Sequence, residues 1–168
     1  MMDTLRKLTV KDAYRLENEV PIVLGFEDEI SEVIDNFAQH GDLRGVFIVD
    51  EEQRFSGVIT RVDLLDWARM QLGAALLMPL TDKDKTLRLS TLVNATTVGD
   101  MLREETSNVS VCTDETLAHA LQIMIDAELI VLPVVNESQK IIGNLTLSEL
   151  LFQVFCKSQE SQKILANS

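Results

Sequence analysis

The sequence predicts a mixed α/β fold of the α+β type, with two β-α-β-β-α repeats packed together in pseudo-twofold symmetry. The stretch GVITRVDLL at 57–65 returns, altered, as GNLTLSELL at 143–151. Two segments that begin at 30 and 117 also have apolar residues at the same helical spacing, and each is followed by two Val- and Ile-rich runs. One such repeat buries too little surface to be stable alone, so we expect the two copies to complete one core.

The first helix of each repeat is predicted at 28–39 and 115–126. The apolar residues recur at i, i+3, i+4, i+7 and i+8, which is one stripe of an amphipathic helix. They are Ile30, Val33, Ile34, Phe37 and Ala38 in the first copy, and Leu117, Ala120, Leu121, Met124 and Ile125 in the second.

Short strands are predicted on both sides of these helices. VPIVLG (20–25) and NVSVCT (108–113) precede them, and the runs at 45–60 and 131–146 follow them as hairpins turning at DEEQ and NESQ. A second helix then begins near Val62, where it is expected to reach 78 before Pro79, and at the matching place in the second copy. The motifs TVKDAY (9–14) and TVGDML (97–102) lead into the repeats. This divides the chain into a first repeat (1–80), a linker (81–96), a second repeat (97–158) and a C-terminal tail (159–168).

Composition narrows the possible partners. The chain has 15 Lys and Arg residues against 27 Asp and Glu, a formal charge of −12, so we expect neither nucleic acid nor a membrane as partner. The start lacks the apolar region of a signal peptide, and the longest apolar run, at 72–80, is too short to span a bilayer. A cytoplasmic location is therefore expected.

The order of elements, with LPVVNESQKIIGNLTLSELL in the second copy and FIVDEEQRFSGVITRVDLL in the first, resembles a tandem pair of CBS domains, the cystathionine-β-synthase-type modules. The resemblance covers about residues 9–157. It implies a regulatory module that is not an enzyme, that binds an adenosine-containing ligand between its repeats, and that dimerises through its helices.

The motif Gly-x-x-Thr-x-x-Asp at 57–63 has two interpretations. As a ligand site, Gly57 would let a ligand approach the backbone, Thr60 would lie beside free N–H groups that can hold a phosphate, and Asp63 would accept ribose hydroxyls. Arg61 could offset negative charge there. As a structural feature, Thr-x-x-Asp is a capping box that needs no ligand.

The second copy has Thr146 and Glu149 at these positions, with Leu147 in place of Arg61. Glu is the usual capping-box residue and its extra methylene would crowd a ribose pocket, so capping is the default interpretation there.

The resemblance also implies an apolar adenine pocket in each copy. Its residues would be Ile22, Val23, Leu43 and Val46 in the first, and Val111, Thr113, Ile130 and Pro133 in the second. Individually, each of these is also an ordinary core residue. Phe47 stands where the second copy has Pro133, and its ring could fill the adenine position or stack on it.

Two functions remain open. The first is a regulatory CBS pair that binds AMP, ADP, ATP, S-adenosylmethionine or NADH, with a single phosphate favoured by the acidic composition, and that signals to an unidentified partner protein. The second is a ligand-free, dimeric interaction protein with the same fold. A homodimer is expected in both, no metal or cofactor is required, and no catalytic motif such as HExxH or GxSxG occurs.

Overall fold

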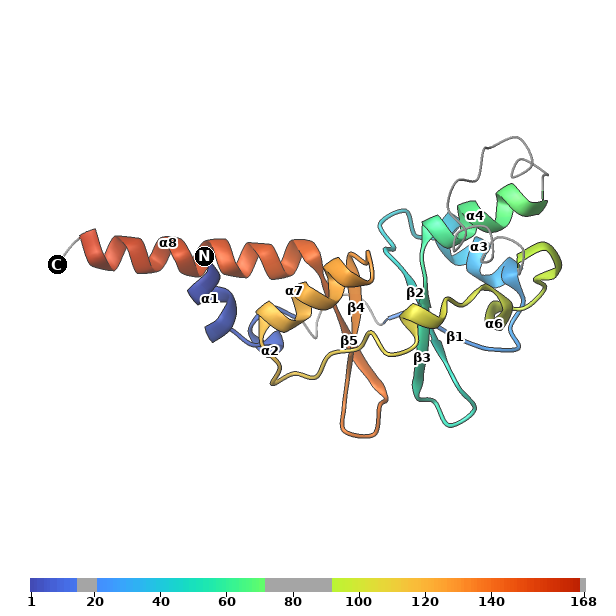
Figure 1. Cartoon of the computed structure of the whole chain (residues 1–168), viewed down its shortest axis with the longest axis horizontal. Coiled ribbons are helices and arrows are strands. Elements are labelled where there is room, and N and C mark those ends of the chain that lie inside the picture. Colours follow the sequence, from blue (N-terminus) through green and yellow to red (C-terminus); the bar gives the residue numbers. More distant parts are fainter. Residues whose placement is uncertain (15–20, 72–91, 167–168) are drawn as a thin grey trace. The chain divides into compact units, whose positions relative to one another are not determined.

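The computed structural model describes residues 1–14, 21–71 and 92–166 (Figure 1). The predicted extension of the second helix to 78, its end at Pro79 and most of the 81–96 linker lie outside these residues. The chain forms two compact units, one from Ile22–Ser107 and the other from Met1–Pro21 together with Asn108–Ser168.

The unit of Ile22–Ser107 contains the first copy of the predicted repeat. Its elements are β1 (Val23–Gly25), α3 (Ile30–Gln39), β2 (Val46–Val49), β3 (Phe55–Ile59) and α4 (Arg61–Gln71), followed by the short helices η2 (Leu92–Asn94), α6 (Val98–Met101) and η3 (Glu104–Thr106). Its sheet has the order β1-β2-β3, with β2 parallel to β1 and antiparallel to β3. Val46 lies opposite Ile59 in this register.

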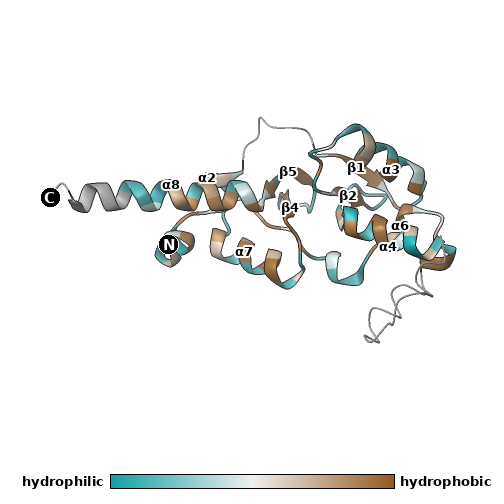
Figure 2. Ribbon diagram, turned by 90° about the horizontal axis from the view of Figure 1, so that it is seen from above, coloured by the Kyte–Doolittle hydropathy of each residue, from teal (hydrophilic) through white to brown (hydrophobic). Residues whose placement is uncertain are grey.

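The core of this unit lies between α3, the sheet and α6. Ile30, Val33 and Phe37 are buried on α3, against a cluster that includes Ile48 on β2 and Met101 on α6. Apolar residues dominate the strands (Figure 2).

The predicted apolar stripes are wider than the buried faces of the helices. Ile34 and Ala38 are exposed on α3, and Ile125 is exposed on α7 (Leu117–Asp126). Positions i, i+3 and i+7 are buried in both helices, whereas i+8 lies on the solvent side of the contact. The buried face is therefore narrower than the apolar stripe in both copies.

The second unit contains the second copy of the repeat. Its elements are α1 (Met2–Lys7), α2 (Val10–Ala13), α7, β4 (Val131–Val135), β5 (Ile141–Thr146) and α8 (Leu147–Ala166). Strands β4 and β5 pair antiparallel, α1 packs on α7 and α8, and α2 packs on α8 (Figure 1). Most of the predicted C-terminal tail is thus a continuation of α8.

The predicted strand at 108–113 is reduced to a single parallel bridge between Val111 and Val134. In the first copy the amide of Phe47 donates to the carbonyl of Ile22 at 3.0 Å, which extends the pairing of β1 with β2. Pro133 occupies the matching position and has no N–H to donate, so the pairing ends sooner.

Each lead-in motif packs on the other repeat. The first motif packs on the second repeat, and the second motif packs on the first. The amide of Val98 donates to the carbonyl of Asp28 in the first copy, and the amide of Val10 donates to the carbonyl of Glu115 in the second, both at 2.8 Å. Isolated bridges join Glu29 to Thr97 and Thr9 to Thr116. The repeats of the sequence and the compact units of the structure therefore divide the chain differently.

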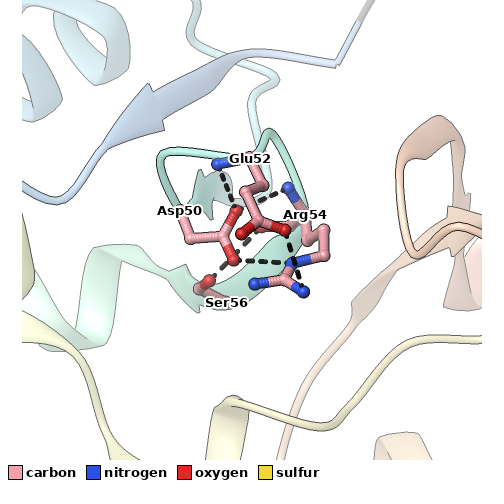
Figure 3. A network of polar contacts seen from close by, with 4 residues as sticks. All are labelled: Asp50, Glu52, Arg54 and Ser56. Carbon is pink, nitrogen blue, oxygen red and sulfur yellow. Dashed lines mark hydrogen bonds and ion pairs between the residues drawn. The ribbon is translucent and has the colours of Figure 1, made fainter.

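The two hairpin turns are built alike. The Oδ1 atom of Asp50 accepts hydrogen bonds from the amides of Glu52 and Arg54, both at 2.9 Å (Figure 3), and Asn136 does the same for Ser138 and Lys140 at 3.0 Å. Gln53 and Gln139 both have a positive φ, 63° and 60°. The amide of Arg54 and its guanidinium hold the pKa of Asp50 below its ordinary value.

Candidate functional site

The motif at the start of α4 forms a closed set of hydrogen bonds. Thr60 follows the last residue of β3, and both its amide and its hydroxyl donate to Oδ2 of Asp63 at 2.7 Å. Asp63 is only 1% exposed. The structure therefore has the capping contact that the sequence left as one of two interpretations, and any ligand at Asp63 must compete with it.

The other carboxylate oxygen of Asp63 faces an arginine that lies outside the predicted site. The Nε atom of Arg103 lies 3.1 Å from Oδ1 of Asp63, and the two side chains are 15% and 2% exposed. Arg103 follows the TVGDML motif directly, just as Arg15 follows TVKDAY. That shared arginine was the available signal, but the sequence alone does not show on which repeat the motif packs.

Arg61 is turned to a different task from the one expected. Its Nη2 atom donates to the carbonyls of Phe37, His40 and Gly41 at 3.1–3.2 Å, and its guanidinium carbon lies 4.8 Å from the centre of the Phe37 ring. These carbonyls belong to the C-terminal end of α3, where a cation is favourable. Arg61 thus caps α3.

The glycines of the motif make room for the protein itself. A Cβ on Gly57 would lie 2.6 Å from Cδ2 of Leu102, and one on Gly143 would lie 2.8 Å from Cε2 of Tyr14. Leu102 and Tyr14 end the two lead-in motifs. A side chain of a lead-in motif fills the space above each glycine, including the space above Gly57 where a ligand was expected to approach.

The second copy forms the same cap with a longer acid. The amide and hydroxyl of Thr146 donate to Oε2 of Glu149 at 2.9 and 2.8 Å, and the amide of Glu149 donates back to Oγ1 of Thr146 at 3.3 Å. Glu149 is half-buried, so it is more accessible than Asp63.

The residues proposed for the adenine pockets fall into three groups. Val46, Val111 and Pro133 are buried core residues, Ile22, Leu43 and Thr113 are half-buried, and Val23 and Ile130 are exposed. Ile22 and Leu43 pack against the core of the first copy. The half-buried and exposed residues can contact a ligand without leaving the core.

Phe47 is part of the core. It is 1% exposed, and its ring meets that of Phe55 edge to face, with the centroids 6.2 Å apart. The ring therefore packs within its own unit and is closed to solvent.

The described residues form neither a metal site nor a membrane-spanning helix. Within 1–14, 21–71 and 92–166, no group of three His, Cys, Asp or Glu side chains is placed to hold a metal ion. In the same part of the chain, no helix is both long and apolar enough to cross a membrane. The imidazole of His119 lies 3.8 Å from the carboxylate of Glu115, one turn earlier.

The CBS domain family matches both repeats of this chain, at residues 10–69 and 98–155. Together these segments make up more than half of the sequence. The chain belongs to the CBS domain family. Each CBS segment includes one lead-in motif except for its first threonine, one hairpin and one Thr-acid pair.

Several solved CBS structures have the same fold. CBSX2 of Arabidopsis thaliana, in complex with AMP, matches with a TM-score of 0.68 and 19% identity over 90% of this chain and 99% of its own. A CBS-domain protein from Thermotoga maritima matches with 0.66 and 24% over 86% and 92%. The CBS pair of protein MJ0100, in complex with 5′-methylthioadenosine and S-adenosyl-L-methionine, matches with 0.59 and 22% over 89% and 97%.

The TM-scores of these neighbours show that the chain shares their fold. The predicted α+β architecture with two repeats, and its likeness to a CBS pair, are confirmed. No curated protein sequence matches this chain significantly.

Proposed function

We propose that this CBS pair is a regulatory module that binds an adenosine-containing nucleotide and passes its bound state to a partner protein. The observation that carries the proposal is the Thr-acid pair at the start of a helix in both CBS segments, Thr60 with Asp63 and Thr146 with Glu149. That two CBS neighbours were solved with AMP and with S-adenosyl-L-methionine supports the adenosine class.

In this proposal the ligand exchanges places with the cap. A phosphate would accept the amide and hydroxyl hydrogens that Thr60 now gives to Asp63, at the positive end of α4. Asp63 would then be able to accept the ribose hydroxyls. Binding would favour the state of the protein in which these contacts exist, by an amount set by the difference in affinity.

The test is calorimetric titration with AMP, ADP, ATP, S-adenosylmethionine and NADH, after checking a denatured sample for co-purified nucleotide. We expect micromolar binding of at least one of them. Because a hydrogen bond to a charged group contributes roughly 1.5–3 kcal/mol, Asp63→Ala should weaken binding about 10-fold or more. Glu149→Ala, measured in parallel, tests the second copy.

Asp100→Ala is the matched control. Asp100 accepts the amide of Thr97 at 3.0 Å, so it also belongs to a Thr-x-x-Asp cap in the same unit, but that cap lies on α6. Losing a cap should lower stability in both variants, whereas only Asp63→Ala should lower affinity. If no nucleotide binds and none co-purifies, the Thr-acid pairs are caps alone and the proposal fails.

The runner-up is a ligand-free interaction protein. It is favoured by the two closed caps and by exposed apolar side chains on the second helix of each repeat, Val62 and Leu65 on α4 and Phe152 and Phe155 on α8. If titration fails, sedimentation of the wild type and of Phe152→Ser/Phe155→Ser would decide whether these residues join copies of the chain.

A further inference from the structure

We propose that Arg103, from the segment that leads into the second repeat, is the basic specificity residue of the Thr60–Asp63 site, and that it makes the site prefer phosphorylated adenosine over adenosine. The inference rests on the proposed function. It assigns to Arg103 the role that the sequence suggested for Arg61.

Arg61 and Arg103 differ in whether their present contacts leave them able to bind a ligand at the site. The Nη2 atom of Arg61 already donates to three carbonyls at the end of α3, and its guanidinium lies over Phe37. Moving Arg61 to a ligand would uncap that helix. Arg103, in contrast, already lies against the acid of the site.

Neighbouring residues on both sides hold Arg103 in position. On its N-terminal side, Leu102 packs against Gly57, which lies three residues before Thr60 on the strand that ends at the site. On its C-terminal side, the carbonyl of Arg103 accepts hydrogen bonds from the amide and the hydroxyl of the fully buried Thr106, at 3.0 and 2.9 Å. Arg103 is therefore held in place from both directions.

The ion pair between Arg103 and Asp63 is close but poorly aligned. Although Nε of Arg103 lies 3.1 Å from Oδ1 of Asp63, this buried N–H makes no directed hydrogen bond within the described part of the chain. The contact is an attraction between charges in which the donor is poorly aimed. A phosphate oxygen within reach could accept from the guanidinium in a fork, which the present contact with Asp63 does not do.

The positive charge of Arg103 also affects how the site receives a phosphate. The chain carries a formal charge of −12, and the carboxylate of Asp63 stands where a phosphate would bind. Removing Arg103 would take one positive charge away from Asp63, so a phosphate there would meet more of this like charge in a poorly hydrated place. Adenosine has no charge and is not subject to this repulsion. Arg103 should consequently affect AMP and adenosine differently.

The test is titration of AMP and of adenosine against the wild type and Arg103→Met. We expect Arg103→Met to weaken AMP binding about 10-fold or more while adenosine binding changes much less, so that the preference for AMP is reduced or lost. Arg54→Met is the matched control, because it removes one positive charge from a hairpin of the same unit and should leave the preference intact.

Arg103→Lys and Arg103→Gln cover the case in which Arg103→Met does not fold. The Lys variant keeps the charge and should retain part of the preference, whereas the Gln variant should lose it. Equal weakening of AMP and adenosine would overturn the inference and make Arg103 merely structural, while the proposed function would stand. Loss of the preference in Arg61→Met instead of Arg103→Met would also overturn it. A wild type that binds no nucleotide would refute the proposed function itself.

Discussion

Gly57 has little room for a side chain, because a Cβ there would lie 2.6 Å from Cδ2 of Leu102. In sequence, the same glycine suggests a close approach of ligand to backbone. In the structure the backbone at Gly57 is closely approached by Leu102, which belongs to the lead-in motif of the second repeat. Since Arg103 follows Leu102, this contact also positions the guanidinium beside Asp63.

Gly57→Ala is therefore expected to destabilise the unit of Ile22–Ser107. The added methyl group must displace Leu102, and overpacking of this kind costs typically about 1–3 kcal/mol. Leu102 is flexible, which favours the lower end of the range. The measurement is urea unfolding followed by the fluorescence of Trp67, the single tryptophan, which lies on α4 of the same unit.

Gly41→Ala is the control for this experiment, since a Cβ there meets nothing within 4 Å. It should leave the unfolding midpoint nearly unchanged. Equal midpoints for the two variants would show that Leu102 does not pack closely on Gly57 in solution.

The residues that carry chemistry were only partly predictable from sequence. The spacing Thr-x-x-Asp allowed a cap and a ligand site equally, because both need an acceptor three residues after the threonine. The ion pair of Asp63 with Arg103 was not predictable, since it joins residues 40 positions apart across an exchange of lead-in motifs. The capping role of Arg61 needed the position of the end of α3.

The elements themselves followed closely from the sequence. Both hairpins, both first helices and the lead-in helices lie where the repeat placed them. Two segments differ. The first strand of the second copy is reduced because Pro133 removes one amide donor, and most of the predicted tail is a continuation of α8. Local periodicity predicts elements well, because it reflects which face each segment must bury. Periodicity cannot reveal that one hydrogen bond is missing between two strands that are distant in sequence.

The lead-in helices also give the chain a dependence on pH. In α6, the amides of Thr96 and Thr97 donate to Asp100 and hold the pKa of its carboxyl below the ordinary value of 3.8. A lowered pKa in the folded state means that the carboxylate stabilises the fold at a pH above about 3.8 and that this contribution is lost as the pH falls below it.

Asp100→Asn should accordingly destabilise the unit at neutral pH, by about 1 kcal/mol or less for an exposed cap. The difference between variant and wild type should be smaller at pH 3 than at neutral pH, because below 3.8 the unfolded chain binds a proton at Asp100 more readily than the folded state does. Urea unfolding followed by Trp67 fluorescence at both pH values measures this. Asp35→Asn removes one negative charge from an exposed position on α3 of the same unit and is the control for the change in charge. A difference that stays constant down to pH 3 would contradict the capping role of Asp100.

In the whole chain, each lead-in motif belongs to the compact unit of the other repeat. The first motif belongs to the unit that contains the second repeat, and the second motif belongs to the unit that contains the first. The repeat and its period were visible in the sequence, and so was the need of each copy for additional buried surface. Which copy each motif completes was not visible, because the two motifs and the two repeats are alike and either pairing would satisfy the pattern.

This exchange makes a prediction that distinguishes it from repeats that fold independently. Val10 and Val98 occupy the same place in the two motifs, and both are fully buried. Truncating a buried aliphatic side chain to alanine costs about 2 kcal/mol, so each variant should loosen the unit in which its valine lies. By hydrogen exchange followed by mass spectrometry, Val10→Ala should lower protection in 108–160, more than 90 residues away in sequence, and leave 22–71 nearly unchanged. Val98→Ala should do the reverse and should also shift the unfolding of Trp67. If instead Val10→Ala loosened the repeat that directly follows it, the lead-in motifs would belong to their own repeats in solution and the exchange would be refuted.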